Sequence, residues 1–289
     1  MNAGKEEDPN FQKILALLLK TKGFDGHQYK PNYIKRRVAV RMRAMETKTY
    51  LDYLRVLQNN RQEPALLLDR LTIHVTEFFR DPNVYQAIKQ NILPGFPVNP
   101  GIKLKIWCAG CSTGEEPYSV AMILKECSFS QPGFDFEIFA TDIDMASIRT
   151  AEKGEYPVEA LKKLSKAQVT RWFYVEGSRA RVVADLKKHV HFRAHDLLSE
   201  WVDELSGFQL IFCRNLLIYL TAPLQQKIYK NFAGALAAGG FLILGLTETL
   251  LGPSRKFYEC VDVRNRIYRL LEKTENFWET NKEEKVSDG

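Results

Sequence analysis

The sequence lacks the features typical of membrane, secreted or low-complexity proteins. Its longest weakly polar run, residues 234–246, is shorter than the about 20 apolar residues that a membrane-spanning helix needs. Charged residues precede any apolar run near the start, so we expect no signal peptide. Five cysteines at irregular spacing favour a reducing cytoplasm over a disulfide framework. The 289 residues, 45% of them hydrophobic, are enough for about two globular domains.

Two nucleotide-binding signatures and a metal site are also missing. The sequence has no Gly-x-Gly-x-x-Gly after its first predicted strand and no Walker lysine. Cys108-x-x-Cys111 lacks a second cysteine pair for zinc and lies in the wrong loop for a redox motif. We interpret these cysteines as packed turn residues. His189, His191 and His195 alternate along a strand, a spacing that does not gather ligands, so no metal is predicted.

The excess positive charge is confined to one part of the chain. Residues 1–60 contain 12 Lys and Arg against 6 Asp and Glu, whereas residues 61–289 contain 29 of each sign. A local basic surface indicates an anionic partner, and nucleic acid, phospholipid and acidic protein all satisfy that requirement.

The first ninety residues have the patterns of helices. Asp8 and Pro9 are a typical helix start, apolar residues follow at helical spacing, and Gly23 ends the segment. Pro31 begins a second helix that carries several arginines. Further helices are predicted at 50–57, 64–73 and from 81 onward. Residues 94–101 contain three prolines and two glycines, so we predict a linker there.

Beyond residue 101, short apolar strands alternate with helices. Strands are predicted at 103–108, 136–140, 190–192, 208–213 and 241–246, with helices at 117–125 and 224–236. This alternation predicts an α/β domain with a mostly parallel sheet covered on both faces. Segments 172–175 and 181–183 interrupt it and flank residues 176–179, which we interpret as a hairpin.

Three polar segments follow predicted strands, where ligands bind in doubly wound folds. The turn 110–117 combines small residues with two glutamates, which suit a cationic or hydroxyl-bearing ligand but also favour any helix start. Asp142 ends the second strand, where an acidic residue can bind ribose hydroxyls. Arg214 and Asn215 follow a central strand. A buried arginine needs an anion, either a ligand or a nearby Glu or Asp.

Together, four blocks resemble the CheR-type chemotaxis receptor methyltransferases. They are Thr76-Glu77-Phe78-Phe79-Arg80, Cys111-Ser112-Thr113-Gly114-Glu115-Glu116-Pro117-Tyr118, Ala140-Thr141-Asp142-Ile143-Asp144 and Cys213-Arg214-Asn215-x-x-Ile218-Tyr219. The resemblance spans residues 10–270. It implies a Rossmann-like domain that uses S-adenosylmethionine, with a small inserted β-subdomain and an all-helical N-terminal domain. The implied activity is methylation of glutamate side chains on chemoreceptors, giving methyl esters and S-adenosylhomocysteine.

The sequence patterns predict the domain bounds, and the resemblance implies a site. The domains are a helical domain at 1–93, a linker at 94–101, a methyltransferase domain at 102–271 with an insertion at about 170–192, and a flexible tail at 272–289. His74 and Asp196 stand where the family commonly has Asn. The implied catalytic residues are Arg80, Arg214 and Tyr219. The implied cofactor site consists of His74, Thr76, Arg80, Glu116, Asp142, Asp196, Leu197, Arg214 and Asn215.

The implied partners are the glutamate-rich cytoplasmic helices of chemoreceptors. We expect them to dock on Arg36, Arg37, Arg41 and Arg43, and we expect a cytoplasmic monomer that inserts in no membrane. Some family members bind the C-terminal pentapeptide of a receptor, which tethers the enzyme to it, and these members have a longer hairpin loop. Here only residues 176–179 connect the two strands, so we predict that this enzyme does not need the tether. Two alternatives are a nucleic-acid methyltransferase, although no Pro-Pro turn follows Asn215, and a non-catalytic cofactor sensor.

Overall fold

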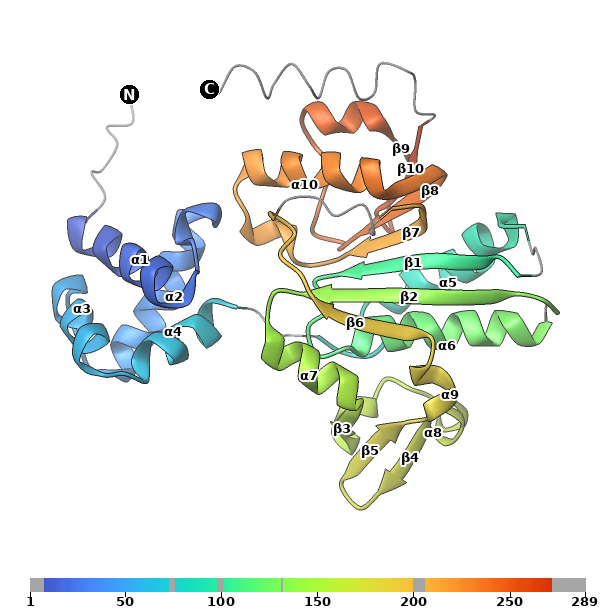
Figure 1. Cartoon of the computed structure of the whole chain (residues 1–289), viewed down its shortest axis with the longest axis horizontal. Coiled ribbons are helices and arrows are strands. Elements are labelled where there is room, and N and C mark those ends of the chain that lie inside the picture. Colours follow the sequence, from blue (N-terminus) through green and yellow to red (C-terminus); the bar gives the residue numbers. More distant parts are fainter. Residues whose placement is uncertain (1–7, 73–75, 98–100, 131, 200–205, 272–289) are drawn as a thin grey trace. The chain divides into compact units, whose positions relative to one another are not determined.

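The computed structural model describes residues 8–72, 76–97, 101–130, 132–199 and 206–271 (Figure 1). The chain divides into two compact units. The helical unit is Met1–His74 together with Tyr219–Gln225, and the sheet unit is Val75–Ile218 together with Gln226–Gly289. The predicted tail at 272–289 lies outside the described residues. No helix among the described segments is long and apolar enough to span a membrane.

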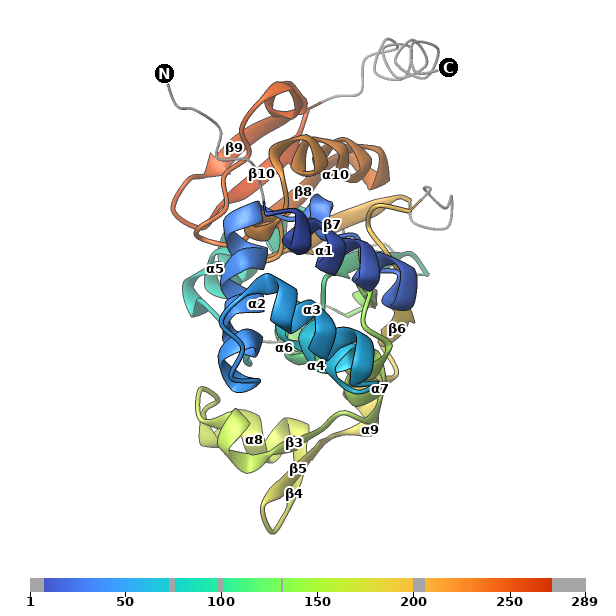
Figure 2. The same cartoon turned by 90° about the vertical axis from the view of Figure 1, so that its left-hand side faces the viewer.

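The helical unit is built as the sequence predicts. The Asp8 side chain accepts a hydrogen bond from the Asn10 N–H, and Gly23, at φ 68°, ends the first helix. Helix α1 contacts α3 and α4, and α2 contacts α4 (Figure 2). Apolar faces of all four helices form one core. The elements are α1 Pro9–Lys22, η1 Gly26–Gln28, α2 Pro31–Ala44, α3 Tyr50–Asn59 and α4 Glu63–Leu71.

A distant segment completes the helical unit. Residues Tyr219–Gln225 follow the Arg-Asn motif by only a few positions, yet they pair with the chain between α1 and α2. The Lys30 N–H donates to the Tyr219 carbonyl at 2.8 Å, and the Thr221 N–H donates to the Gln28 carbonyl at 3.0 Å. The Tyr219 ring packs against the Tyr33 ring, with centroids 4.7 Å apart. The helical unit therefore holds the predicted catalytic tyrosine.

The main sheet of the sheet unit has the strand order β6-β2-β1-β7-β8-β10-β9 (Figure 1). The first five strands in that order are parallel, and β10 runs antiparallel to both of its neighbours, β8 and β9. No strand was predicted after residue 246, because β9 and β10 are short and β9 is mostly exposed. The strands are β1 Lys103–Ala109, β2 Asp135–Asp142, β6 Val190–Ala194, β7 Phe208–Cys213, β8 Leu236–Leu244, β9 Tyr258–Asp262 and β10 Ile267–Leu270.

Helices cover both faces of this sheet, as the alternating pattern predicts. Ile106 and Cys108 on one face share a core with Val120 and Leu124 of α6. Trp107 points to the opposite face, where it packs edge-on against Phe232 of α10. The helical elements are α5 Pro82–Ala87, η2 Ile88–Ile92, η3 Leu93–Gly95, α6 Glu115–Ser130, α7 Met145–Lys153, η4 Val158–Leu161, α8 Lys166–Trp172, α9 Ala184–Lys187, η5 Leu217–Tyr219, α10 Ala222–Ala235 and η6 Pro253–Phe257.

The hairpin is present, but it belongs to a larger insertion than predicted. Strands β4 Phe173–Glu176 and β5 Arg179–Val182 are joined by a two-residue turn in which Gly177 has φ 56°. Strand β3 Glu155–Pro157 pairs with β5 in a three-stranded sheet. The small sheet thus begins near residue 155 rather than 170. Residues 190–192 belong to β6 of the main sheet.

The boundary between the units also differs from the predicted linker at 94–101. Helix α5 lies in the sheet unit, because its buried Val84 and Tyr85 share one core with Leu104 and Ile106 of β1. The change between units falls at 74/75 instead. The proline and glycine cluster at 94–101 therefore lies inside the sheet unit, between α5 and the first strand β1.

Candidate functional site

The predicted site residues of the sheet unit lie where parallel strands end. Glu116 follows β1, Asp142 ends β2, Asp196 follows β6, and Arg214 and Asn215 follow β7. Strands β2 and β6 lie on one side of β1, whereas β7 and β8 lie on the other. The chain order therefore reverses between β1 and β7. Ligands of doubly wound sheets bind at such a switch point, at the carboxyl ends of the strands.

The loop after β1 is tightly bound to the end of β2. The N–H groups of Gly110 and Cys111 both donate to the Thr141 carbonyl, at 2.8 and 2.9 Å. The Ser112 N–H donates to Asp142 Oδ2 at 2.8 Å, and the Asp144 N–H donates to Asp142 Oδ1 at 2.9 Å. These bonds orient the Asp142 carboxylate at the strand end.

Glycine is required twice in this loop. Gly110 has φ 77° and Gly114 has φ 96°, conformations that residues with a Cβ rarely adopt. A Cβ on Gly110 would lie 2.8 Å from the Leu216 side chain, and one on Gly114 would lie 2.8 Å from the Ala151 Cβ. Gly110 thus lets the loop after β1 approach the loop after β7, and Gly114 lets it approach α7.

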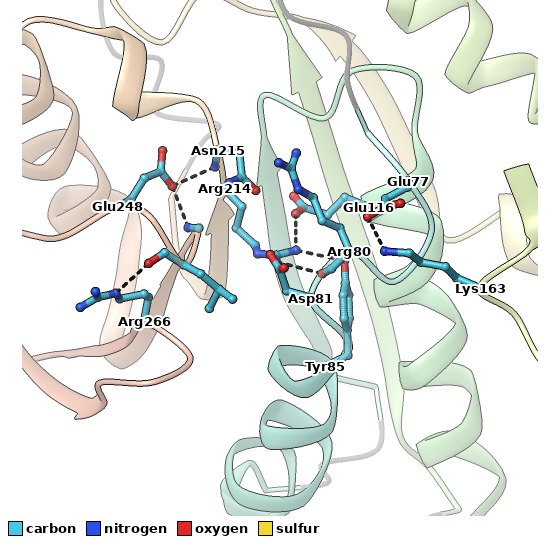
Figure 3. A network of polar contacts seen from close by, with 12 residues as sticks. Glu77, Arg80, Asp81, Tyr85, Glu116, Lys163, Arg214, Asn215, Glu248 and Arg266 are labelled. Atoms are coloured by element: carbon cyan, nitrogen blue, oxygen red, sulfur yellow. Dashed lines mark hydrogen bonds and ion pairs between the residues drawn. The ribbon is translucent and has the colours of Figure 1, made fainter.

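Arg214 connects three segments of the sheet unit (Figure 3). Its side chain is 1% exposed. Nη2 donates to Asp81 Oδ2 at 2.8 Å and to the Arg80 carbonyl at 2.9 Å. Nη1 donates to Glu116 Oε2 at 3.2 Å and to the Tyr85 hydroxyl at 3.3 Å. Burial raises the pKa of Glu116, and the Arg214 charge opposes that rise. The anions that a buried arginine needs therefore include this glutamate, which was expected to bind cofactor.

Three buried polar atoms at this edge have no hydrogen-bond partner among the described residues. They are Ser112 Oγ after β1, and Arg214 Nε and Asn215 Oδ1 after β7. Buried polar atoms are rarely left unpaired in native proteins. A ligand carrying both acceptors and donors, such as an amino-acid group, would satisfy these atoms. The strand-end loops thus fit a cofactor of that chemistry.

The side chains of the remaining predicted cofactor residues take no part in the hydrogen bonds described above for Asp142 and Arg214. Thr76 and Arg80 are half-buried in the segment before α5. Asp196 Oδ1 accepts a hydrogen bond from the Leu198 N–H at 2.9 Å, and Leu197 is half-buried. His74 lies outside the described residues.

Sequence reasoning missed one carboxylate, Glu248. It is 3% exposed and accepts hydrogen bonds from the backbone N–H groups of Asn215, Leu217 and Gly245. The available signal was an acidic residue in the otherwise uncharged stretch 241–254. That signal is weak without knowledge of what the glutamate contacts.

The predicted docking arginines on α2 fall into two groups. Arg36 and Arg43 are exposed, and Arg37 lies over the Tyr33 ring at 5.5 Å from its centroid. Arg41 differs, because its Nε and Nη2 donate to the two carboxylate oxygens of Glu63 at 2.9 and 2.6 Å.

This pair is internal to the helical unit. The Glu63 side chain is fully buried, and the Tyr53 hydroxyl donates to it at 2.7 Å. Arg41 thus has an intramolecular role that differs from the docking role predicted for it.

Cys108 and Cys111 are packed side chains, as predicted, although Cys108 lies in strand β1 and only Cys111 lies in the turn after it. Cys108 and Cys111 are buried free thiols, and burial raises the pKa of each. The His189 ring stacks on Phe136 with centroids 4.4 Å apart. Across the described residues, no three His, Cys, Asp or Glu side chains form a group able to hold a metal ion.

Comparison with known proteins assigns both units to one family. The profile "CheR methyltransferase, SAM binding domain" matches residues 74–266, and "CheR methyltransferase, all-alpha domain" matches residues 9–72. A chemotaxis protein methyltransferase of Listeria monocytogenes is 33% identical over 235 residues, which cover 80% of this chain and 87% of that protein. The Escherichia coli chemotaxis protein methyltransferase is 30% identical, covering 86% of this chain and 87% of its own. Chemotaxis protein methyltransferase 1 of Pseudomonas aeruginosa is 36% identical, covering 64% and 69%.

Proposed function

The chain belongs to the CheR methyltransferase family of S-adenosylmethionine-dependent enzymes, and on this premise we propose that it methylates glutamate side chains on the cytoplasmic helices of chemoreceptors. The observation that carries the proposal is the set of unpaired buried atoms of Ser112, Arg214 and Asn215 at the switch point of the sheet. A soluble cytoplasmic monomer without a tethering peptide is part of the same proposal.

The cofactor supplies a methyl group activated on a sulfonium sulfur. In the proposed site, Arg214 Nε and Ser112 Oγ would donate to its carboxylate, and Asn215 Oδ1 would accept from a donor group. Asp142, oriented by the Ser112 and Asp144 N–H groups, would accept from the ribose hydroxyls. The bond between Arg214 and Glu116 keeps the guanidinium in position.

The acceptor needs alignment rather than activation. A glutamate has an ordinary pKa of about 4.3 and is ionised at neutral pH, so no general base is needed. The enzyme has to hold the carboxylate oxygen, methyl carbon and sulfur in line, and such positioning can lower a barrier by about 7–11 kcal/mol. Tyr219 would position the methyl end, and Arg80 would orient the carboxylate. Because the reaction consumes both charges, a strong ion pair to the acceptor would slow it.

The helical unit supplies the proposed docking surface. Arg36, Arg37 and Arg43 lie on α2 and form no ion pair with a carboxylate of the described residues, whereas Arg41 is paired with Glu63. An acidic receptor helix complements this surface, and the excess positive charge of residues 1–60 favours its approach. We therefore retain three of the four arginines in the proposed docking surface.

A basic surface is also compatible with a nucleic-acid substrate, so the test compares the two. The enzyme is incubated with S-adenosylmethionine labelled in its methyl group, together with a receptor cytoplasmic fragment or with total RNA. We expect label on the receptor fragment and none on RNA. Label on RNA alone would refute the proposed substrate. Cofactor binding without any transfer would indicate a sensor instead.

A further inference from the structure

The Glu248 carboxylate accepts four backbone hydrogen bonds. Oε2 accepts from the N–H groups of Gly245 at 2.7 Å and Asn215 at 2.9 Å. Oε1 accepts from Leu217 at 2.7 Å and Ile218 at 3.3 Å. Figure 3 shows Glu248 pointing from the segment after β8 toward Asn215. One buried side chain thus binds the loop after β7 on both sides of its bend.

The bonded loop has a conformation that needs support. Asn215 has φ 61°, in the left-handed region, which residues with a Cβ adopt only with backbone strain, although asparagine adopts it more readily than most. Its N–H and those of Leu217 and Ile218 converge on one carboxylate. Hydrogen bonds to a charged group are stronger than those between neutral groups, so these three bonds help to offset the strain. The carboxylate therefore stabilises the bend that orients the Asn215 side chain.

The segment that carries Glu248 is itself held in place. A Cβ on Gly245 would lie 2.7 Å from the Asn215 nitrogen and 2.8 Å from Glu248 Oε2, so the backbones are in close contact. Arg266 Nε donates to the Leu246 carbonyl at 3.2 Å, and the Arg266 carbonyl accepts from the Leu244 N–H at 3.1 Å. The bend after β8 and the bend after β7 are thus held against each other by close backbone contact and hydrogen bonds.

We propose that Glu248 is a positioning residue for methyl transfer, which sets the Asn215 amide for cofactor binding and the Leu217–Ile218 turn that leads directly into Tyr219. It acts through backbone N–H groups and does not touch the reactants. The inference rests on the proposed function, because Asn215 and Tyr219 have their roles only there. Its cofactor-binding part is measurable without any receptor.

The most direct variant is Glu248→Gln, which keeps the size of the side chain. In either orientation of the amide, its NH2 group faces two of the backbone donors, so two of the four hydrogen bonds are lost. Gly245→Ala is a second variant, which keeps the Glu248 charge but places a methyl group against both the Asn215 backbone nitrogen and Glu248 Oε2, and so disturbs the contact between them. Glu63→Gln is the control, since it alters a buried glutamate of the helical unit.

The affinity for S-adenosylhomocysteine is measured by titration calorimetry, and kcat is measured on a receptor fragment, both well below the melting temperature of each variant. Glu248→Gln and Gly245→Ala should each weaken the affinity and lower kcat on the order of tenfold. Glu63→Gln should lower the melting temperature without changing the affinity.

A purely structural role predicts a different result. In that case both variants would melt earlier, yet bind and turn over like the wild type when folded, and this outcome would overturn the inference. If Glu248→Gln does not fold, Gly245→Ala decides by the same criteria. If the wild type does not methylate the receptor, the proposed function is refuted instead. The affinity for S-adenosylhomocysteine still tests whether Glu248 positions Asn215 for cofactor binding.

Discussion

Replacing Arg214 by methionine removes the charge at the centre of the site while keeping an unbranched side chain. The substitution breaks the ion pairs to Asp81 and Glu116 and the bond to the Arg80 carbonyl. Loss of one partner of a buried ion pair costs about 3–5 kcal/mol. The Asp81 side chain is 30% exposed and can regain water, whereas Glu116 is 12% exposed, so we take the lower end of this range.

A loss of about 3 kcal/mol corresponds to roughly a hundredfold change in the folding equilibrium. For a unit of about 200 residues it lowers the melting temperature by about 6–12 °C. The control is Arg269→Met, because Arg269 pairs with Glu259 on the surface, where both side chains are 49% exposed. Exposed pairs contribute about 0–1 kcal/mol, so this variant should melt near the wild type.

The cost of Arg214→Met should also depend on pH. Burial raises the pKa of Glu116 above its ordinary 4.5, and Arg214 restrains that rise, so the variant should have the higher pKa. An acid whose pKa is raised on folding loses stability as pH rises through the folded-state pKa. Both proteins lose stability alike up to the raised folded-state pKa of Glu116 in the wild type, so the difference between them should grow only above that pKa. Denaturant unfolding at several pH values measures it, and a small difference that does not vary with pH would refute this account of the network.

Three further results are expected. The double variant Arg36→Glu, Arg43→Glu should lower methylation of a receptor fragment about tenfold or more and leave the affinity for S-adenosylhomocysteine unchanged; an equal loss of cofactor affinity would contradict separate sites. Added salt should weaken wild-type activity in the same way, because it screens exposed charges beyond about 10 Å at 0.1 M. Asp142→Asn should weaken that affinity about tenfold, since hydrogen bonds to a charged group contribute about 1.5–3 kcal/mol, and calorimetry showing wild-type affinity would remove Asp142 from the site. The receptor pentapeptide Asn-Trp-Glu-Thr-Phe should give no heat when titrated into the enzyme, because the two-residue turn between β4 and β5 is shorter than the loop that holds this peptide in some family members. Micromolar binding would contradict an enzyme that works without a tether.

Local signals predicted the elements well. Asp8, Pro9 and Gly23 mark the ends of α1 by hydrogen bonding and backbone conformation alone, which do not depend on the rest of the fold. The parallel strands were found because burial on both faces makes them apolar runs. Strand β9 was missed, since an edge strand with exposed Glu259 and Cys260 lacks that signal.

Long-range contacts were out of reach of such signals. The sequence cannot reveal that Tyr219 pairs with Lys30, or that Arg41 binds a glutamate 22 positions away. The alternatives for Arg214, a ligand or a nearby carboxylate, were correctly framed, and the structure shows Asp81 and Glu116 as its partners. Glu248 was missed because its hydrogen bonds are made to backbone groups that only folding brings to it.

The central claim is that the acceptor is a glutamate side chain of a chemoreceptor. The most direct measurement is tandem mass spectrometry of a receptor cytoplasmic fragment after incubation with the enzyme and S-adenosylmethionine, before and after mild alkali. We predict one added methyl group on individual glutamate side chains of the receptor helices, and its release as methanol in alkali. A methyl group that survives alkali, or that lies on a nitrogen, would contradict the account.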